Sequence, residues 1–173
     1  MELALHAGAR DAGMIDVCDI PFDAGFRDFC KEDVCGHYGR NWLCPPHAGE
    51  IHALIDRAQG YDRALVYETV AEIADKRDKT SIDKAALLHD EAAQRILEGS
   101  PPGDLLHLSA GTCRICERCT AMDGEPCRNP KCALPSMAAY GIHVCALAER
   151  CGLRYSNGDD TVTYFGAVLF RIW

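Results

Sequence analysis

The sequence contains no long apolar run. Its strongest apolar stretch, residues 165–172, is short and strand-like, whereas a membrane-spanning helix needs about 20 apolar residues. The first fourteen residues include Glu2 and Asp11 and have no continuous apolar core, so they do not resemble a secretion signal. We therefore expect a soluble protein with no membrane partner, located in the cytoplasm.

Basic residues are in the minority. The chain has 18 Lys and Arg residues against 26 Asp and Glu residues, and its formal net charge is −8. A negatively charged protein is not attracted to a phosphate backbone, so nucleic acid is not expected as a partner.

Several familiar catalytic patterns are also absent. The sequence has no H-E-x-x-H, no G-x-S-x-G and no phosphate-binding glycine loop, so hydrolase, zinc-peptidase and nucleotide-binding functions lack support. It also has no Ser/Gly linker or break in composition. We therefore expect residues 1–173 to form a single cysteine-rich domain.

Cysteine, in contrast, is abundant, with eleven residues in the chain. This content is below that of disulfide scaffolds but far above the norm for cytosolic proteins. The excess therefore predicts metal ligands in a reducing compartment, and we expect a cell with little oxygen.

Four of the cysteines form the most specific motif. They follow the pattern C-x2-C-x2-C-x7-C and are Cys113, Cys116, Cys119 and Cys127. Three thiols at three-residue steps on a loop can converge on one iron–sulfur cubane, and a fourth completes the thiolate set. A zinc ribbon usually draws its ligands from two separated pairs, whereas Cys116 belongs to both pairs here. We expect a [4Fe-4S] cluster, with zinc as the alternative.

An earlier and looser motif, C-x4-C-x8-C-P-P, contains Cys30, Cys35 and Cys44. If these three thiols hold a second cubane, one iron lacks a cysteine ligand and is open to water, a histidine (His37 or His47), a cofactor or a substrate. Two alternatives stay open. The loop can pack over the first cluster, with its aromatic residues shielding the site, or one of its thiols can ligate that same cluster.

The remaining thiols are weaker candidates. Cys18, on the strand before the first motif, is expected in the core, as are Cys145 and Cys151, which lie at helical spacing. Cys132 follows Cys127 by C-x4-C and can replace it or complete the first set. The proline just after Cys127-Arg128-Asn129 favours Cys127, and Arg128 is expected to donate to cluster sulfurs.

The periodicity of apolar residues predicts four strands alternating with three helices. The expected strands are 15–20, 63–70, 105–109 and 161–172, and the expected helices are 45–59, 80–98 and 136–150. Residues 22–44 are expected to form a loop. This order indicates an α/β (or α+β) layered domain with two cysteine-rich metal loops.

With these residues in view, the chain resembles an uncharacterised family of predicted metal-binding proteins common in anaerobic bacteria and archaea, domain of unknown function 2284. The resemblance rests on three blocks, residues 30–46, 109–130 and 135–142. Two positions depart from the family pattern, because Ala138 and His143 stand where acidic residues are usual. The resemblance implies metal binding and names no reaction.

The leading hypothesis is an iron–sulfur protein that transfers electrons to a redox partner, either a protein or a small molecule. One alternative is an enzyme that uses the three-cysteine centre, with its open iron, on a small molecule. The other is a structural zinc module that mediates protein interactions.

Overall fold

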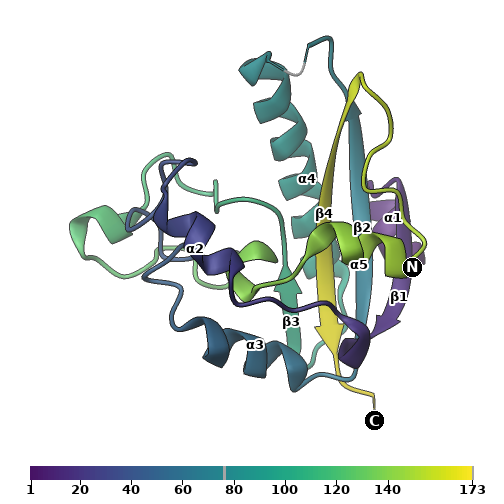
Figure 1. Cartoon of the computed structure of the whole chain (residues 1–173), viewed down its shortest axis with the longest axis horizontal. Coiled ribbons are helices and arrows are strands. Elements are labelled where there is room, and N and C mark those ends of the chain that lie inside the picture. Colours follow the sequence, from purple (N-terminus) through teal and green to yellow (C-terminus); the bar gives the residue numbers. More distant parts are fainter. Residues whose placement is uncertain (76, 173) are drawn as a thin grey trace.

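The computed structural model describes residues 1–75 and 77–172, so positions 76 and 173 of the expected domain lie outside the described residues. It shows four strands in one antiparallel sheet, in the order β1-β2-β4-β3 (Figure 1). Their bounds are Asp11–Asp16 for β1, Arg63–Glu72 for β2, Leu105–Leu108 for β3 and Thr161–Phe170 for β4. The fold is α+β, which confirms the expected class and number of strands.

Five α-helices and three short 3-10 turns complete the described part of the chain. The helices are α1 (Glu2–Ala7), α2 (Phe26–Lys31), α3 (Ile51–Gln59), α4 (Lys79–Gly99) and α5 (Val144–Arg150). The 3-10 turns are η1 (Val17–Asp19), η2 (Thr120–Asp123) and η3 (Ala138–Tyr140). None of the described helices is both long and apolar enough to span a membrane.

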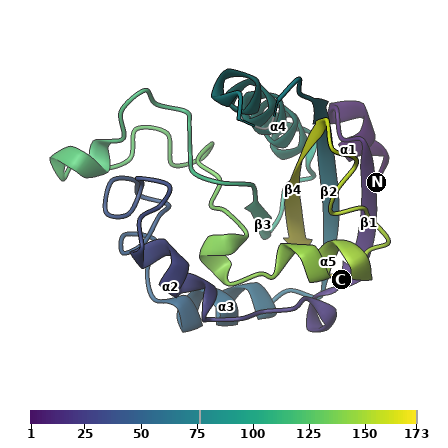
Figure 2. The same ribbon diagram turned by 45° about the horizontal axis from the view of Figure 1, so that its top comes forward.

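The sheet is covered on both faces. Strands β2 and β4 pair over ten residues, and successive side chains point to opposite faces. On one face Val66, Ala167 and Leu169 pack under α3, α5 and η3. On the other face Tyr67 and Val168 pack under α1 and α4 (Figure 2). The result is a three-layer arrangement with an apolar core on each side of the sheet.

Two predicted element boundaries were wrong because of close backbone contacts. The first strand begins at Asp11 rather than Ile15, and it contains Gly13, where a Cβ would lie 2.7 Å from the carbonyl oxygen of Cys151. The last helix begins at Val144 rather than Ser136. Gly141 has a left-handed backbone conformation, with φ 69°, which interrupts the expected helix. A Cβ on it would lie 2.8 Å from a backbone oxygen of the segment before α2. Only glycine fits either approach.

Other predictions differed in smaller ways. Helix α1 was not predicted, and α2 lies inside the expected loop 22–44, because six-residue helices carry too little periodicity to be recognised. Helix α3 starts at Ile51, after a turn that contains the cis Pro45-Pro46 bond. The side chain of Asp78 caps α4 by accepting the backbone N–H of Thr80.

The two cysteine-rich segments lie side by side beyond β3, which is one of the two edge strands of the sheet (Figures 1 and 2). We call residues 27–49 and 110–134 together the cysteine lobe. The second segment follows β3 directly, and an isolated bridge between Ser109 and Ser136 closes it at its base. The fold therefore brings both cysteine motifs to the same edge of the sheet.

Candidate metal centre

The four thiols of the C-x2-C-x2-C-x7-C motif line one small pocket. Cys113, Cys116 and Cys119 come from the chain after β3, and η2 follows them before the chain returns to the same pocket at Cys127. All four residues are half-buried. The open volume between the lining side chains is about 20 Å³, so this pocket is closely packed.

Hydrogen bonds within the second segment hold this turn in shape. The Thr120 hydroxyl donates to the carbonyl of Pro126 at 3.0 Å. The side-chain amide of Asn129 donates to Sγ of Cys116 at 3.3 Å, the kind of contact that orients a thiolate ligand from outside. Arg128 was expected to donate to cluster sulfurs. Its guanidinium instead donates to the carbonyl of Arg118.

Side chains of the first cysteine-rich segment, residues 27–49, hydrogen-bond to the second segment, residues 110–134. The side-chain amide of Asn41, which is 5% exposed, donates to the carbonyl of Cys113 at 3.1 Å. The indole N–H of Trp42 donates to the carbonyl of Glu125 at 3.0 Å and to the Thr120 hydroxyl at 3.3 Å. Both Asn41 and Trp42 line the thiol pocket. Trp42, an aromatic residue of the first loop, therefore packs against the segment that carries the second motif.

The three cysteines of the first motif lie outside the thiol pocket but near one another. Cys30 is in α2 and half-buried, Cys35 is exposed, and Sγ of half-buried Cys44 lies 3.4 Å from the hydroxyl of Thr112. Burial raises the pKa of Cys44, the Thr112 hydrogen bond lowers it, and the thiols of Cys35, Cys30 and Cys119 raise it further. Cys44 therefore lies near Cys119 as well as near the other two thiols of its own motif, at the junction of the two motifs.

Arg27 anchors the first segment to the body of the protein. Its guanidinium, almost fully buried, donates to the carbonyl of Ala139 in η3 at 2.9 Å and to that of Gly49 at 3.1 Å. Burial raises the pKa of Cys30, and the positive charge of Arg27 opposes that shift. A buried arginine between two backbone carbonyls is therefore both a structural link and the cation next to the first thiol.

Four thiols make a donor set of the kind that a sulfur-preferring metal takes, although in the described residues their side chains do not converge on one metal position. Burial raises the pKa of Cys113, the backbone N–H of Ile115 lowers it, and the other three thiols of the motif raise it. Thiolates that line one pocket would repel one another, and a metal cation bound to them would relieve that repulsion because it favours their deprotonated form. In the part of the chain that the structure describes, no three Cys, His, Asp or Glu side chains are arranged to hold a metal ion.

The weaker candidate thiols lie elsewhere. Cys132 is exposed and lines a different cavity from Cys127, while its carbonyl accepts a hydrogen bond from Gln94. Cys18 is exposed in η1, so its expected place in the core was wrong. Cys145 and Cys151 are half-buried; Cys151 packs against the core below α5, where burial raises its pKa to about 11.

Two buried histidines were missed as a pair by the sequence analysis. The Tyr67 hydroxyl lies 2.8 Å from Nε2 of His107, and the Thr69 hydroxyl lies 2.9 Å from Nδ1 of His89. Burial lowers the pKa of His89 to about 3 and that of His107 to about 4. A signal existed, because His89 falls on the apolar face of the α4 pattern, between Ala85 and Ala93.

The site and fold together define a cysteine-rich α+β protein with two thiol-bearing segments at one sheet edge. The family model described as "Predicted metal-binding protein (DUF2284)" matches residues 13–170, so the chain belongs to this family. A comparison with curated proteins found no match, and a comparison with solved structures found none either.

Proposed function

We propose that this protein is a cytoplasmic iron–sulfur protein that transfers electrons in anaerobic redox metabolism. The observation that carries the proposal is the pocket lined by all four thiols of one motif, Cys113, Cys116, Cys119 and Cys127. A [4Fe-4S] cluster held there supplies one-electron redox chemistry.

The surrounding residues have roles that suit such a centre. Asn129 orients Cys116 through its amide N–H, and hydrogen bonds from amides to sulfur are one means by which proteins adjust cluster potentials. Trp42 covers one side and limits the access of water. The exposed chain around η2 leaves a short path to the surface, where a redox partner, either a protein or a small molecule, would receive the electron.

The grouping of Cys30, Cys35 and Cys44 supports a second centre beside the first one. These thiols influence one another, and exposed Cys35 leaves one side of the group open to solvent. A cluster with only three thiolates has an open iron position, which is the basis for the alternative that the protein is an enzyme acting on a small molecule. The influence of Cys119 on Cys44 also suits a single cluster shared by both motifs.

Anaerobic purification followed by analysis of iron, acid-labile sulfide and zinc tests the proposal. We expect brown protein with iron and sulfide in equal amounts and negligible zinc. Colourless, zinc-containing protein after anaerobic reconstitution would instead indicate the structural zinc module.

A matched pair of variants tests the ligand assignment. Cys116→Ser removes a thiol from the pocket, whereas Cys151→Ser trims a half-buried thiol below α5. We expect Cys116→Ser to lose most of its iron and Cys151→Ser to keep it. Equal iron content in the two variants would contradict the assignment.

Electron paramagnetic resonance tests the second centre. After mild oxidation, we expect a three-iron signal in the wild type that is absent from Cys44→Ser, because an iron without a thiolate is lost first. Identical spectra and iron content would mean that the first motif only packs around a single cluster.

A further inference from the structure

A cavity of about 400 Å³ lies where the cysteine lobe meets the edge strand β3. Both cysteine-rich segments line it, together with side chains from α3, the end of α4, and β3. Its volume falls within the range of small-molecule sites. An apolar wall is formed by Leu54, Leu97, Leu105, Leu134 and Val168. The cavity therefore offers room and apolar surface for the body of a small organic molecule.

The titratable side chains of opposite sign are unevenly distributed at this cavity. Arg57 of α3, Lys131 of the second cysteine-rich segment and His47 of the first one line it. Among the described residues, no aspartate or glutamate does so, although the chain has 26 acidic and 18 basic residues. Arg114, in contrast, is paired with Asp90.

The two permanent cations of the cavity have no counter-ion. In the part of the chain that the structure describes, neither Arg57 nor Lys131 forms an ion pair. They come from separate parts of the fold, and packing brings them to one cavity. Two uncompensated positive charges beside an apolar wall attract an anion.

Arg57 and Tyr140 form a pair of donors at this cavity. Nη1 of Arg57 donates to the Tyr140 hydroxyl at 3.3 Å, and both residues line the cavity. The contact places the hydroxyl at the guanidinium of an exposed residue, while the Tyr140 ring is fixed in the core below α3. No acceptor for the proton of the Tyr140 hydroxyl is found among the described residues. That proton and the remaining guanidinium N–H groups can bind one anion together.

We propose that this cavity binds a small organic carboxylate with an apolar body. The planar fork of the Arg57 guanidinium matches a carboxylate, and the Tyr140 hydroxyl donates to the same group. Lys131 and His47 add basic groups to the cavity. The leucine-rich wall contacts the body of the ligand, and an inorganic anion such as phosphate would gain nothing from that wall.

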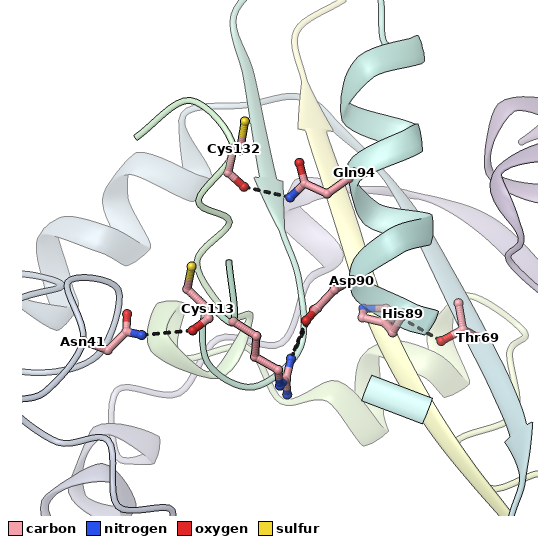
Figure 3. Close-up of polar contacts among 8 residues, drawn as sticks. Asn41, Thr69, His89, Asp90, Gln94, Cys113 and Cys132 are labelled. Atoms are coloured by element: carbon pink, nitrogen blue, oxygen red, sulfur yellow. Dashed lines mark hydrogen bonds and ion pairs between the residues drawn. The ribbon is translucent and has the colours of Figure 1, made fainter. Parts of the chain in front are cut away.

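The cavity shares a wall with the thiol pocket. Trp42, Leu43 and Ala133 line both of them. The neighbouring Asn41 fixes this wall, because its side-chain amide donates to the carbonyl of Cys113 (Figure 3). A bound carboxylate should therefore change the environment of the cluster, and this part of the inference rests on the proposed function. The carboxylate site itself rests on the cavity and its basic groups.

Saturation-transfer NMR on the anaerobically purified protein tests the inference, with hexanoate as the probe and n-hexylamine as the charge-reversed control. We expect saturable binding of hexanoate and at least tenfold weaker binding of the amine. The net charge of −8 favours the amine at non-specific sites, so a preference for the carboxylate reports the local charges of the cavity.

Two variants test the donors, each with a matched control. Arg57→Gln should weaken hexanoate binding about 5- to 20-fold, and Tyr140→Phe about 3- to 10-fold. Arg154→Gln and Tyr155→Phe change exposed residues outside the cavity and should bind like the wild type. Because Arg57 is exposed, its replacement leaves the core intact, and a melting temperature near that of the wild type checks this.

Two results would overturn the inference. One is equal binding of hexanoate and n-hexylamine to the wild type. The other is unchanged hexanoate binding in both Arg57→Gln and Tyr140→Phe, which would show that this pair of donors is only a structural contact.

Paramagnetic resonance of the reduced protein with and without hexanoate forms a separate arm. We expect the signal of the cluster to change when hexanoate binds, and an unchanged signal at saturating hexanoate would overturn the link through Trp42. If the protein holds no iron, this arm has no signal and the proposed function fails, while the NMR titration still decides whether the cavity binds carboxylates.

Discussion

The sheet and the cysteine lobe are stabilised in different ways. In the sheet, β2 and β4 form a ten-residue ladder with an apolar core on each face, so burial of apolar area dominates. In the lobe few side chains are buried, and large apolar residues such as Phe29 (65% exposed) and Val34 (88% exposed) face solvent. Hydrogen bonds from Asn41, Trp42 and Arg27 hold the lobe instead.

This difference indicates that metal binding contributes more to the stability of the cysteine lobe than to that of the sheet. A segment that buries little apolar surface gains little free energy from packing, and metal binding can supply the missing part. The sheet needs no such help. We therefore expect the two regions to respond independently to changes that target one of them, and four predictions test this, from the largest expected effect to the smallest.

Removing the metal should loosen the lobe and leave the sheet intact. After anaerobic chelation, we expect amide hydrogen exchange in residues 113–127 to quicken about 1,000-fold, equivalent to about 4 kcal/mol of local stability, because the thiols then repel or lose their common partner. Exchange in β2 and β4 should stay within a factor of a few. Simultaneous loss of protection in both regions would show that they unfold as one unit.

Acid should destabilise the sheet through its buried histidines. His89, with a pKa of about 3, and His107, with a pKa of about 4, stay neutral in the folded protein, while the unfolded chain takes up protons near pH 6.5. The free energy of unfolding is therefore highest above pH 6.5 and falls as the pH decreases toward 4, by up to about 1.4 kcal/mol per pH unit for each histidine.

The variant His89→Gln isolates this contribution. Glutamine keeps a group that can hydrogen-bond to Thr69 and does not titrate, so the pH slope of urea unfolding between pH 6 and 4 should be smaller than in the wild type. The exposed His6→Gln change is the matched control for replacing one histidine by glutamine. Parallel pH profiles for wild type and His89→Gln would contradict the assignment.

Gly166→Ala should weaken the sheet without touching the metal. A Cβ at this position would lie 2.2 Å from the ring and hydroxyl of Tyr67, which is buried and hydrogen-bonded to His107 and so has no room to move. We expect a loss of about 2 kcal/mol in the free energy of unfolding, with the iron content unchanged. Gly158→Ala, at a loop position with φ 123° and open space around it, measures backbone strain without a clash.

The smallest effect is expected at His143, the residue before α5. His143 caps α5, with its Nδ1 accepting the backbone N–H of Ala146 at 3.2 Å. Aspartate is a better capping residue and places a negative charge at the helix N-terminus, so His143→Asp should raise the free energy of unfolding by about 0.5–1 kcal/mol. A melting temperature equal to or below that of the wild type would show that the histidine is retained for another contact.

Much of the sheet could be predicted because its pattern is local. The runs that became β2 and β4 are rich in β-branched and aromatic residues, and α4 carries a clear helical stripe between Asp78 and Gly99. Predictions of element boundaries failed where a distant backbone segment packs closely, as at Gly13 and Gly141. No residue near these glycines in the sequence indicates which segment will pack there.

The sequence by itself determined the cysteine motif with its spacing, the family, the four strands and the acidic charge. Ligand spacing and apolar periodicity are properties of short stretches of chain, so they can be read without the structure. Only the tertiary structure decided that Asn41 and Trp42 close the thiol pocket, that Trp42 lines a second cavity as well, and that Arg57 contacts Tyr140 at that cavity. Those relations join residues as many as 83 positions apart, as between Trp42 and Glu125, or depend on side-chain surroundings. Packing brings such residues together, and no local pattern encodes it.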